Sequence, residues 1–166
     1  MPWVTKQDVI QETKQFGFNG IRFLIFWAAV EPKKGEYDYK YLERLAERVK
    51  WYTDNGAYVV LDRHQDVYGY AVGGNGAPAW ATDVGPYEEY LKEDVTDIIY
   101  ENTEWEPVKH MWWLENVNPA TMEAYKRFWD YDNHPWLQDH YVNAWKEVVK
   151  KFKDNPKVIG YDLMNE

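Results

Sequence analysis

The sequence predicts an α/β fold built on a parallel sheet. Three short apolar runs, at residues 20–26, 57–62 and 157–164, have the composition of buried parallel strands. Amphipathic helical patterns lie before the first run, between the first two, and before the third. Strands that alternate with single amphipathic helices form parallel βαβ units. The order is therefore helix, strand, helix, strand, a long irregular segment, helix, strand.

The first helix is expected to begin after Thr5. Thr5 and Asp8, three residues apart, have the pattern of a capping box, and Gly17 provides a stop. Residues at helical spacing predict one apolar face. These are Val9, Thr13 and Phe16. The first strand follows at residue 20, and residues 31–35 form a turn.

The second helix is expected from its N-cap, Asp38, to the Asn55-Gly56 pair, which ends it. Its apolar residues recur at helical spacing and predict the buried face. They are Leu42, Leu45, Val49 and Tyr52. The second strand, residues 57–62, runs directly into Arg63-His64-Gln65-Asp66.

The regular alternation stops between residues 67 and 133. Glycines at positions 73, 74 and 76 lack the following Lys-Ser/Thr of a phosphate loop, so we interpret them as loop flexibility over a substrate cleft. Asn118-Pro119 predicts an N-cap with proline at the first helical position. The apolar residues after it are Met122, Tyr125, Phe128 and Trp129.

The last helix is expected from Pro135 to the Asn155-Pro156 stop, followed by the third strand at residues 157–164. Its apolar face repeats every three or four residues. The residues of that face are Leu137, Tyr141, Ala144, Val148 and Phe152.

Composition excludes several classes of function. The 166 residues contain 28 acidic and 19 basic side chains, a net charge of −9, which argues against a nucleic-acid or anionic-membrane partner. No run approaches the roughly 18 apolar residues of a membrane span, and the first residues lack a signal-peptide pattern. The absence of cysteine excludes disulfides, thiolate zinc sites and a cysteine nucleophile.

Aromatic residues are unusually frequent: 10 Trp, 14 Tyr and 6 Phe. Such rings can simply fill a core. They are also typical of carbohydrate binding, because a pyranose presents an apolar C–H face that stacks on indole.

Polar or aromatic residues follow all three expected strands: Trp27 the first, His64-Gln65-Asp66 the second and Asn165-Glu166 the third. The carboxyl ends of parallel strands gather at one edge of the sheet, where α/β proteins place their sites. Arg22 lies within the first strand, and we expect it to be buried against a carboxylate. A structural ion pair with Asp162 is the alternative for Arg22, and His64 taken alone could be a hydrogen-bonded strand-end histidine.

A metal hydrolase is a weaker alternative. The available ligands follow no HExxH or comparable spacing. They are His64, Asp66, His110, His134, Asp139 and His140.

Four blocks of sequence resemble family 5 glycoside hydrolases of clan A. Residues 17–22, with Trp27, 30–32 and 35–38, resemble the second barrel unit of that family, and residues 161–166 its fourth-strand signature. Residues 61–68 and 74–81, with Phe128-Trp129, are similar to the endoglycoceramidase-like branch.

The resemblance implies a (β/α)8 TIM barrel and hydrolysis of β-glycosides with retention, with no cofactor and no metal. By the same resemblance, Glu166 is the general acid/base, Asn165 binds the sugar 2-hydroxyl, and Arg22 orients the nucleophile. His64, Asp66 and, less specifically, Gln65 bind the sugar, while Trp129 and Trp27 form walls or stacking platforms.

The family places its nucleophilic glutamate after the seventh strand, whereas this sequence matches strands 2 to 4. We therefore expect residues 1–166 to form part of a TIM-barrel catalytic domain, with 67–133 as an insertion on the active-site face. A complete barrel takes about 250 residues. Alone, the chain is expected to be inactive and to need the rest of the barrel or another chain.

The expected substrate is a β-linked oligosaccharide or the glycan of a glycolipid. The related activities are β-glucosidase, β-galactosidase and endoglucanase. The family resemblance favours secretion. A non-catalytic carbohydrate-binding protein, or an inactive barrel fragment, is the alternative.

Overall fold

A computed structural model describes residues 4–91 and 116–165. Its centre is a parallel sheet in the order β1-β2-β3, formed by β1 (Gly20–Ile25), β2 (Tyr58–Arg63) and β3 (Val158–Asp162). The predicted α/β fold with three parallel strands is confirmed.

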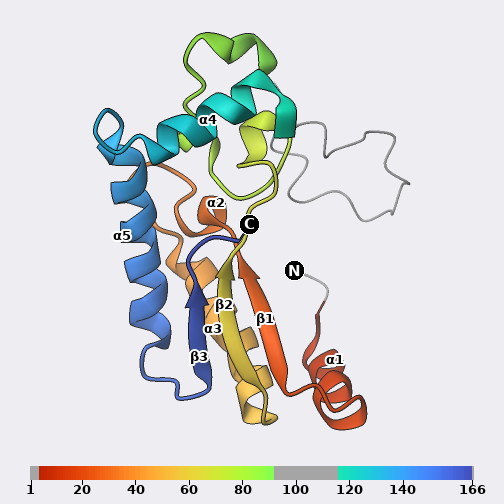
Figure 1. The fold of residues 1–166 in the computed structure, drawn as a ribbon. Helices are drawn as coiled ribbons and strands as arrows, with labels where there is room; N and C mark the ends of the chain where they lie inside the picture. The colour runs from red at the N-terminus through yellow and green to blue at the C-terminus, as the bar shows by residue number, and fades with distance from the viewer. Residues whose placement is uncertain (1–3, 92–115, 166) are drawn as a thin grey trace.

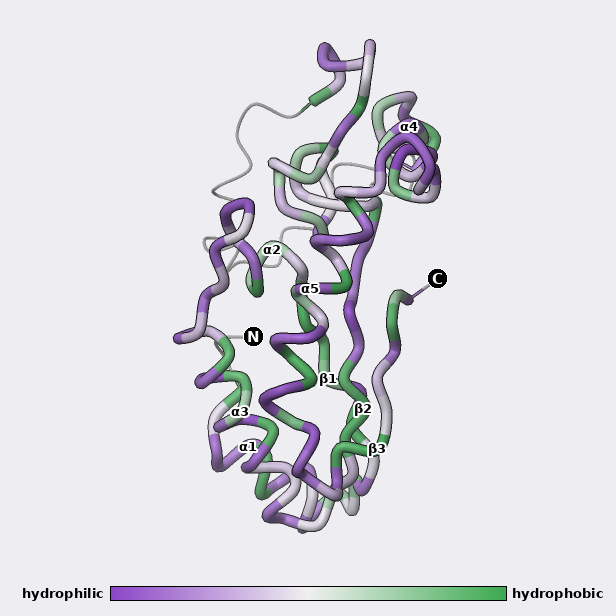
Figure 2. Tube along the Cα trace, turned by 90° about the vertical axis from the view of Figure 1, so that its left-hand side faces the viewer, coloured by the Kyte–Doolittle hydropathy of each residue, from purple (hydrophilic) through white to green (hydrophobic). Residues whose placement is uncertain are grey.

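Helices cover one face of this sheet. The long helices α3 (Tyr39–Asp54) and α5 (Pro135–Phe152) pack there, and no described element covers the other face (Figure 1, Figure 2). The strands point toward α2 (Trp27–Val30) and α4 (Pro119–Trp129), which lie beyond their carboxyl ends (Figure 1). The face of the sheet opposite α3 and α5, called the bare face below, is therefore uncovered by described elements and adjoins the carboxyl ends of the strands.

The two long helices follow their sequence signals. Asp38 caps α3 by accepting a hydrogen bond from the Tyr41 N–H, and all four predicted core residues of α3 are buried. In α5, four of the five predicted residues are buried and Tyr141 is half-buried. Both helices therefore bury the face that their apolar spacing defines.

The first helix departs from its prediction. The capping box of Thr5 and Asp8 is present at the start of α1 (Lys6–Ile10), but a π-helical turn, η1 (Gln11–Gln15), comes directly after it. A π turn takes more residues than an α turn and rotates the next residues about the helix axis. Phe16 is 57% exposed, so its prediction as a member of the buried face is wrong.

In the described part of the segment after β2, short 3-10 helices precede α4. Those between β2 and residue 91 are η2 (Tyr70–Val72), η3 (Ala79–Ala81) and η4 (Gly85–Tyr90). Asn118 caps α4 through the Ala120 N–H, as predicted. Met122 and Trp129 are exposed on α4. Within residues 4–91 and 116–165, no helix has the length and apolar character of a membrane span.

Candidate active site

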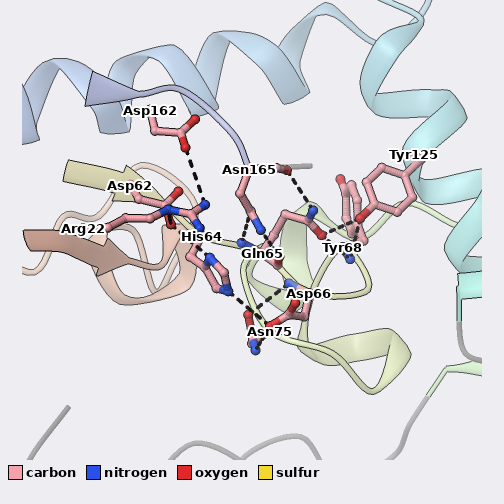
Figure 3. Close-up of polar contacts among 10 residues, drawn as sticks. All are labelled: Arg22, Asp62, His64, Gln65, Asp66, Tyr68, Asn75, Tyr125, Asp162 and Asn165. Atoms are coloured by element: carbon pink, nitrogen blue, oxygen red, sulfur yellow. Dashed lines mark hydrogen bonds and ion pairs between the residues drawn. The ribbon is translucent and has the colours of Figure 1, made fainter. Parts of the chain in front are cut away.

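An ion-pair cluster occupies the uncovered face of the sheet. Nε of Arg22 on β1 lies 3.0 Å from Oδ2 of Asp62 on β2, and its NH2 atom lies 3.5 Å from Oδ2 of Asp162 on β3 (Figure 3). The register explains the cluster, because Asp62 and Asp162 are paired neighbours in the parallel ladder. One arginine thus joins all three strands.

Arg22 has carboxylate partners, as its sequence position predicts, and one of them is Asp162, the partner expected by the alternative of a structural ion pair. Its side chain is 54% exposed, so the prediction that it is buried is wrong. The physical reason is strand alternation: Ile21 and Phe23 pack against the core, so Arg22 between them points to the opposite face of the sheet. Asp62, by contrast, is fully buried.

His64 lies between two carboxylates. Its Nδ1 is 3.0 Å from Oδ2 of Asp62, and its Nε2 is 3.3 Å from Oδ2 of Asp66 (Figure 3). Phe26 packs edge-on against the imidazole, which is only 16% exposed. These contacts fix the ring on both sides, and its two nitrogens differ in partner.

A reciprocal amide contact joins the ends of β2 and β3. The Gln65 N–H donates to Oδ1 of Asn165 at 2.7 Å, and Nδ2 of Asn165 donates to the Gln65 carbonyl at 3.0 Å. The Gln65 side chain also donates to the Asn165 carbonyl at 3.2 Å (Figure 3). Asn165 is 2% exposed, so its amide holds two strand ends together in this structure.

Helix α4 contributes to the same network. The Tyr125 hydroxyl donates to Oε1 of Gln65 (Figure 3). The Tyr68 N–H donates to the same Oε1 and to the Tyr125 hydroxyl oxygen, each at 3.0 Å. Val67 and Tyr68 have positive φ values of 54° and 64°, a left-handed conformation that costs about 1 kcal/mol or more per residue. The Tyr68 hydroxyl donates to the Ala81 carbonyl, and its burial raises the pKa of this phenol. These bonds hold the strained turn in place.

The glycine-rich segment is tightly bonded and makes close backbone contacts. Asp66 and Asn75 pair through two backbone hydrogen bonds of 3.0 and 2.8 Å. A Cβ at position 74 would lie 1.9 Å from the Asp66 carbonyl oxygen, and Gly76 has a φ of +124°. The glycines therefore permit a close backbone approach, a role that their interpretation as loop flexibility did not include.

Arg63 is a buried residue that sequence analysis did not single out. Its guanidinium lies 4.3 Å from the Tyr141 ring centroid and 5.1 Å from that of Trp145, and its NH1 donates to the Tyr141 carbonyl at 2.6 Å. Burial lowers the pKa of Arg63 to about 10. Cation–π contacts are favourable in such a site and fasten α5 to β2.

A small pocket lies beside His64 and Gln65. Rings from α2, α4 and α5 form much of its wall. The lining residues are Trp27, Arg63, His64, Gln65, Tyr68, Gly76, Ala77, Tyr125, Phe128, Tyr141 and Met164.

The two tryptophans expected at the site differ in exposure. Trp27 is 2% exposed, and its Nε1 donates to the buried Glu31 carboxylate at 3.0 Å, so its ring lines the pocket wall without an open stacking face. Trp129, at the end of α4, is 63% exposed and contacts Phe128. Its ring is available for stacking.

Two residues that the sequence singles out, the expected acid/base Glu166 and the possible metal ligand His110, lie outside the described residues. Among the described residues, no group of three or more His, Asp or Glu side chains is arranged to hold a metal ion. Asp62 and Asn75 lie within the family-like segments 61–68 and 74–81, but strand register and loop closure set their partners.

Comparison with known proteins identifies related chains. The family model described as cellulase (glycosyl hydrolase family 5) matches residues 1–166. The chain is 32% identical over 163 residues to endoglycoceramidase I of Rhodococcus hoagii (strain 103S), covering 98% of this chain and 29% of that protein. It is 31% identical over 158 residues to an endoglycoceramidase of Cyanea nozakii, covering 92% of this chain and 31% of the relative.

A solved structure gives the same relationship. The chain is similar to endo-glycoceramidase II from Rhodococcus sp., with 42% identity and a TM-score of 0.80, over 100% of this chain and 35% of that one. The sequence thus spans about a third of the length of these relatives. The likeness supports the predicted fold class, a part of a TIM barrel.

Proposed function

The chain belongs to glycosyl hydrolase family 5, and from this premise we propose that it supplies part of the active site of a retaining β-glycoside hydrolase. One observation carries the proposal. Arg22, Asp62, His64, Asp66 and the Gln65–Asn165 pair converge at the carboxyl ends of three adjacent parallel strands. Active sites of such barrels lie at that end.

The proposed substrate is a β-linked oligosaccharide, in particular the glycan of a glycolipid. Relatives named endoglycoceramidase support this choice. Endo-glycoceramidase II from Rhodococcus sp., to which the chain is 40% identical in that structure, has also been solved in complex with ganglioside GM3. The exposed ring of Trp129 provides a stacking surface, and Trp27 forms the wall of the pocket.

Retaining hydrolysis needs two carboxyl groups about 5–5.5 Å apart. One attacks the anomeric carbon, while the other protonates the departing glycosidic oxygen. We assign the proton donor to Glu166 from its position in the family motif. The nucleophile is a glutamate outside residues 1–166, oriented by the Arg22 guanidinium, whose exposed side chain faces the open side of the sheet.

The proposed acid must hold its proton near neutral pH. The negative charge of a nearby nucleophile raises the pKa of a carboxyl group. When the glycosyl–enzyme bond forms, that charge disappears, and the same group can then accept a proton from the attacking water. Asp62 and Asp66 hold the His64 ring beside the reacting sugar, and Asn165 binds the 2-hydroxyl with capacity left after its bonds to Gln65.

We further propose that residues 1–166 act only within an assembled barrel. This term denotes these residues together with the remaining strands, on the same polypeptide or a second one. The bare face of the sheet supports the proposal, since parallel sheets are normally covered on both faces. In this arrangement residues 67–133 are the insertion over the active site.

The test uses 4-methylumbelliferyl β-lactoside as substrate. The assembled barrel should release the fluorophore, and proton NMR should detect the β-anomer of the sugar first. Initial release of the α-anomer would contradict retention. Turnover by residues 1–166 alone would contradict the need for further strands. Binding without turnover by the assembled barrel would favour a carbohydrate-binding protein.

A further inference from the structure

The site contains a side chain with no role in the proposed reaction, Asn75. Its Nδ2 donates to Oδ2 of Asp66 at 3.1 Å, and its Oδ1 accepts from the Asp66 N–H at 3.1 Å (Figure 3). The two backbones also pair, and Gly74 permits the close approach. The Asn75 side chain therefore hydrogen-bonds both the main chain and the carboxylate of Asp66.

These hydrogen bonds make the two carboxylate oxygens of Asp66 different in their contacts. Oδ2 contacts both Nδ2 of Asn75, at 3.1 Å, and Nε2 of His64, at 3.3 Å. Among the described residues no donor contacts Oδ1, and the side chain is 34% exposed. Oδ2 is thus anchored by two neighbours, while Oδ1 keeps its capacity to accept a hydrogen bond.

We propose that Asn75 is a positioning residue that aims Oδ1 of Asp66 at a sugar hydroxyl. The inference rests on the proposed glycosidase function and deepens it, because it identifies what sets the direction of a specificity-determining carboxylate. A carboxylate free to rotate about its terminal torsion loses part of its hydrogen-bond energy to ordering. With Nδ2 on one oxygen, that torsion is fixed before the sugar binds.

The structure offers a variant that isolates the donor. Asn75→Asp keeps the size of the side chain and an oxygen to accept the Asp66 N–H, but replaces the Nδ2 donor with a second carboxylate oxygen. Asn133→Asp is the matched control, because Nδ2 of Asn133 donates to the Asp130 carboxylate at 2.9 and 3.0 Å in an exposed turn. Both variants add one negative charge beside an aspartate.

The assay is steady-state hydrolysis of 4-methylumbelliferyl β-lactoside by the assembled barrel. Asn75→Asp should raise KM about tenfold, the change that corresponds to roughly 1.4 kcal/mol, the low end for a bond to a charged group. Its kcat should change by less than about twofold, since the lost interaction serves ground state and transition state alike. Asn133→Asp should match the wild type.

Lactosides deoxygenated at one hydroxyl at a time provide a readout that a merely structural role would not move. For the analogue that lacks the hydroxyl bound by Asp66, the KM of the wild type should rise, whereas the KM of Asn75→Asp should rise little further. The reason is that the missing hydroxyl and the substitution remove the same interaction. Equal losses by Asn75→Asp on every analogue would overturn the positioning role.

The exchanged pair Asp66→Asn/Asn75→Asp separates structure from recognition. It restores a donor and an acceptor between the two positions but moves the carboxylate. Its melting temperature should return toward the wild type while KM stays raised, and recovery of KM would overturn the proposal. An active wild type with an unchanged Asn75→Asp variant overturns only the role of Asn75. An inactive wild-type barrel overturns the proposed function and this inference with it.

Discussion

The amide contact between the ends of β2 and β3 gives a quantitative prediction for Asn165→Ala. The substitution removes the acceptor of the Gln65 N–H and the donor to the Gln65 carbonyl, bonds of 2.7 and 3.0 Å. Gln65 is 8% exposed and Asn165 only 2%, so water reaches the released backbone groups poorly. A buried polar group left without its partner costs about 1–3 kcal/mol.

We therefore expect Asn165→Ala to lower the free energy of unfolding by about 3 kcal/mol, allowing for partial hydration of one of the two groups. For the assembled barrel, such a loss lowers the melting temperature by roughly 6–12 °C. Thermal unfolding followed by circular dichroism measures the shift. Asn143→Ala is the control, because Asn143 is exposed on α5 and, within residues 4–91 and 116–165, its side chain accepts only from Nζ of Lys146.

The control should change stability by no more than about 0.5 kcal/mol. If Asn165→Ala matches that control, the contact does not hold the strand ends together. The stabilising role assigned to the Asn165–Gln65 contact would then be refuted.

Two further predictions concern the loop and pH. Gly74→Ala should destabilise the protein by about 1–3 kcal/mol, since the new Cβ would lie 1.9 Å from the Asp66 carbonyl oxygen. Gly20→Ala, where no atom lies within 4 Å of the new Cβ, should be neutral in the same thermal unfolding assay. Burial raises the pKa of Tyr41 and of Tyr141 to about 12 from 10.0, so their contribution to stability is full below pH 10 and is lost as pH rises toward 12. The pKa of buried Arg63 is lowered to about 10, so this group instead makes the folded state more stable as pH rises above 10. Tyr41→Phe should reduce the loss of stability at alkaline pH, measured by urea unfolding. An alkaline loss that Tyr41→Phe leaves unchanged would contradict the assignment to that phenol.

Sequence patterns predict the parts of this fold that depend on near neighbours. Asp38 caps α3 through a residue three positions away, and the apolar spacing of α3 and α5 defines the face each helix buries. The strands follow from short apolar runs between these helices. Phe16 shows the limit, because one π-helical turn rotated it away from the expected face.

The site was predictable in position but less so in its contacts. The strand ends indicated where His64, Gln65, Asp66 and Asn165 would gather. Their bonding partners depend on register and loop closure, since Asn165 and Gln65 are 100 residues apart in sequence. In sequence, a glycine that allows two backbones to approach closely, such as Gly74, cannot be distinguished from a glycine in a flexible loop.

Arg63 and Tyr125 had no local signal. The guanidinium of Arg63 is buried among rings that come from α5, and Tyr125 reaches Gln65 across 60 residues of sequence. Such contacts follow from packing of distant elements. They therefore required the structure.

We propose that residues 1–166 bring the acid/base carboxyl group, that of Glu166, to a retaining glycosidase. Glu166→Ala in the assembled barrel tests it most directly, with 4-methylumbelliferyl β-lactoside as substrate and sodium azide as added nucleophile. The aryl leaving group departs without full protonation, so the glycosyl–enzyme still forms, while its hydrolysis lacks the base. Azide needs no deprotonation to attack the anomeric carbon and displace the enzyme carboxylate.

We predict that Glu166→Ala loses about 10²–10⁴-fold in activity, that azide restores turnover, and that the product is the β-lactosyl azide. Undiminished activity without azide would contradict the claim. An α-lactosyl azide would contradict it as well, because that product indicates loss of the nucleophile rather than of the acid/base.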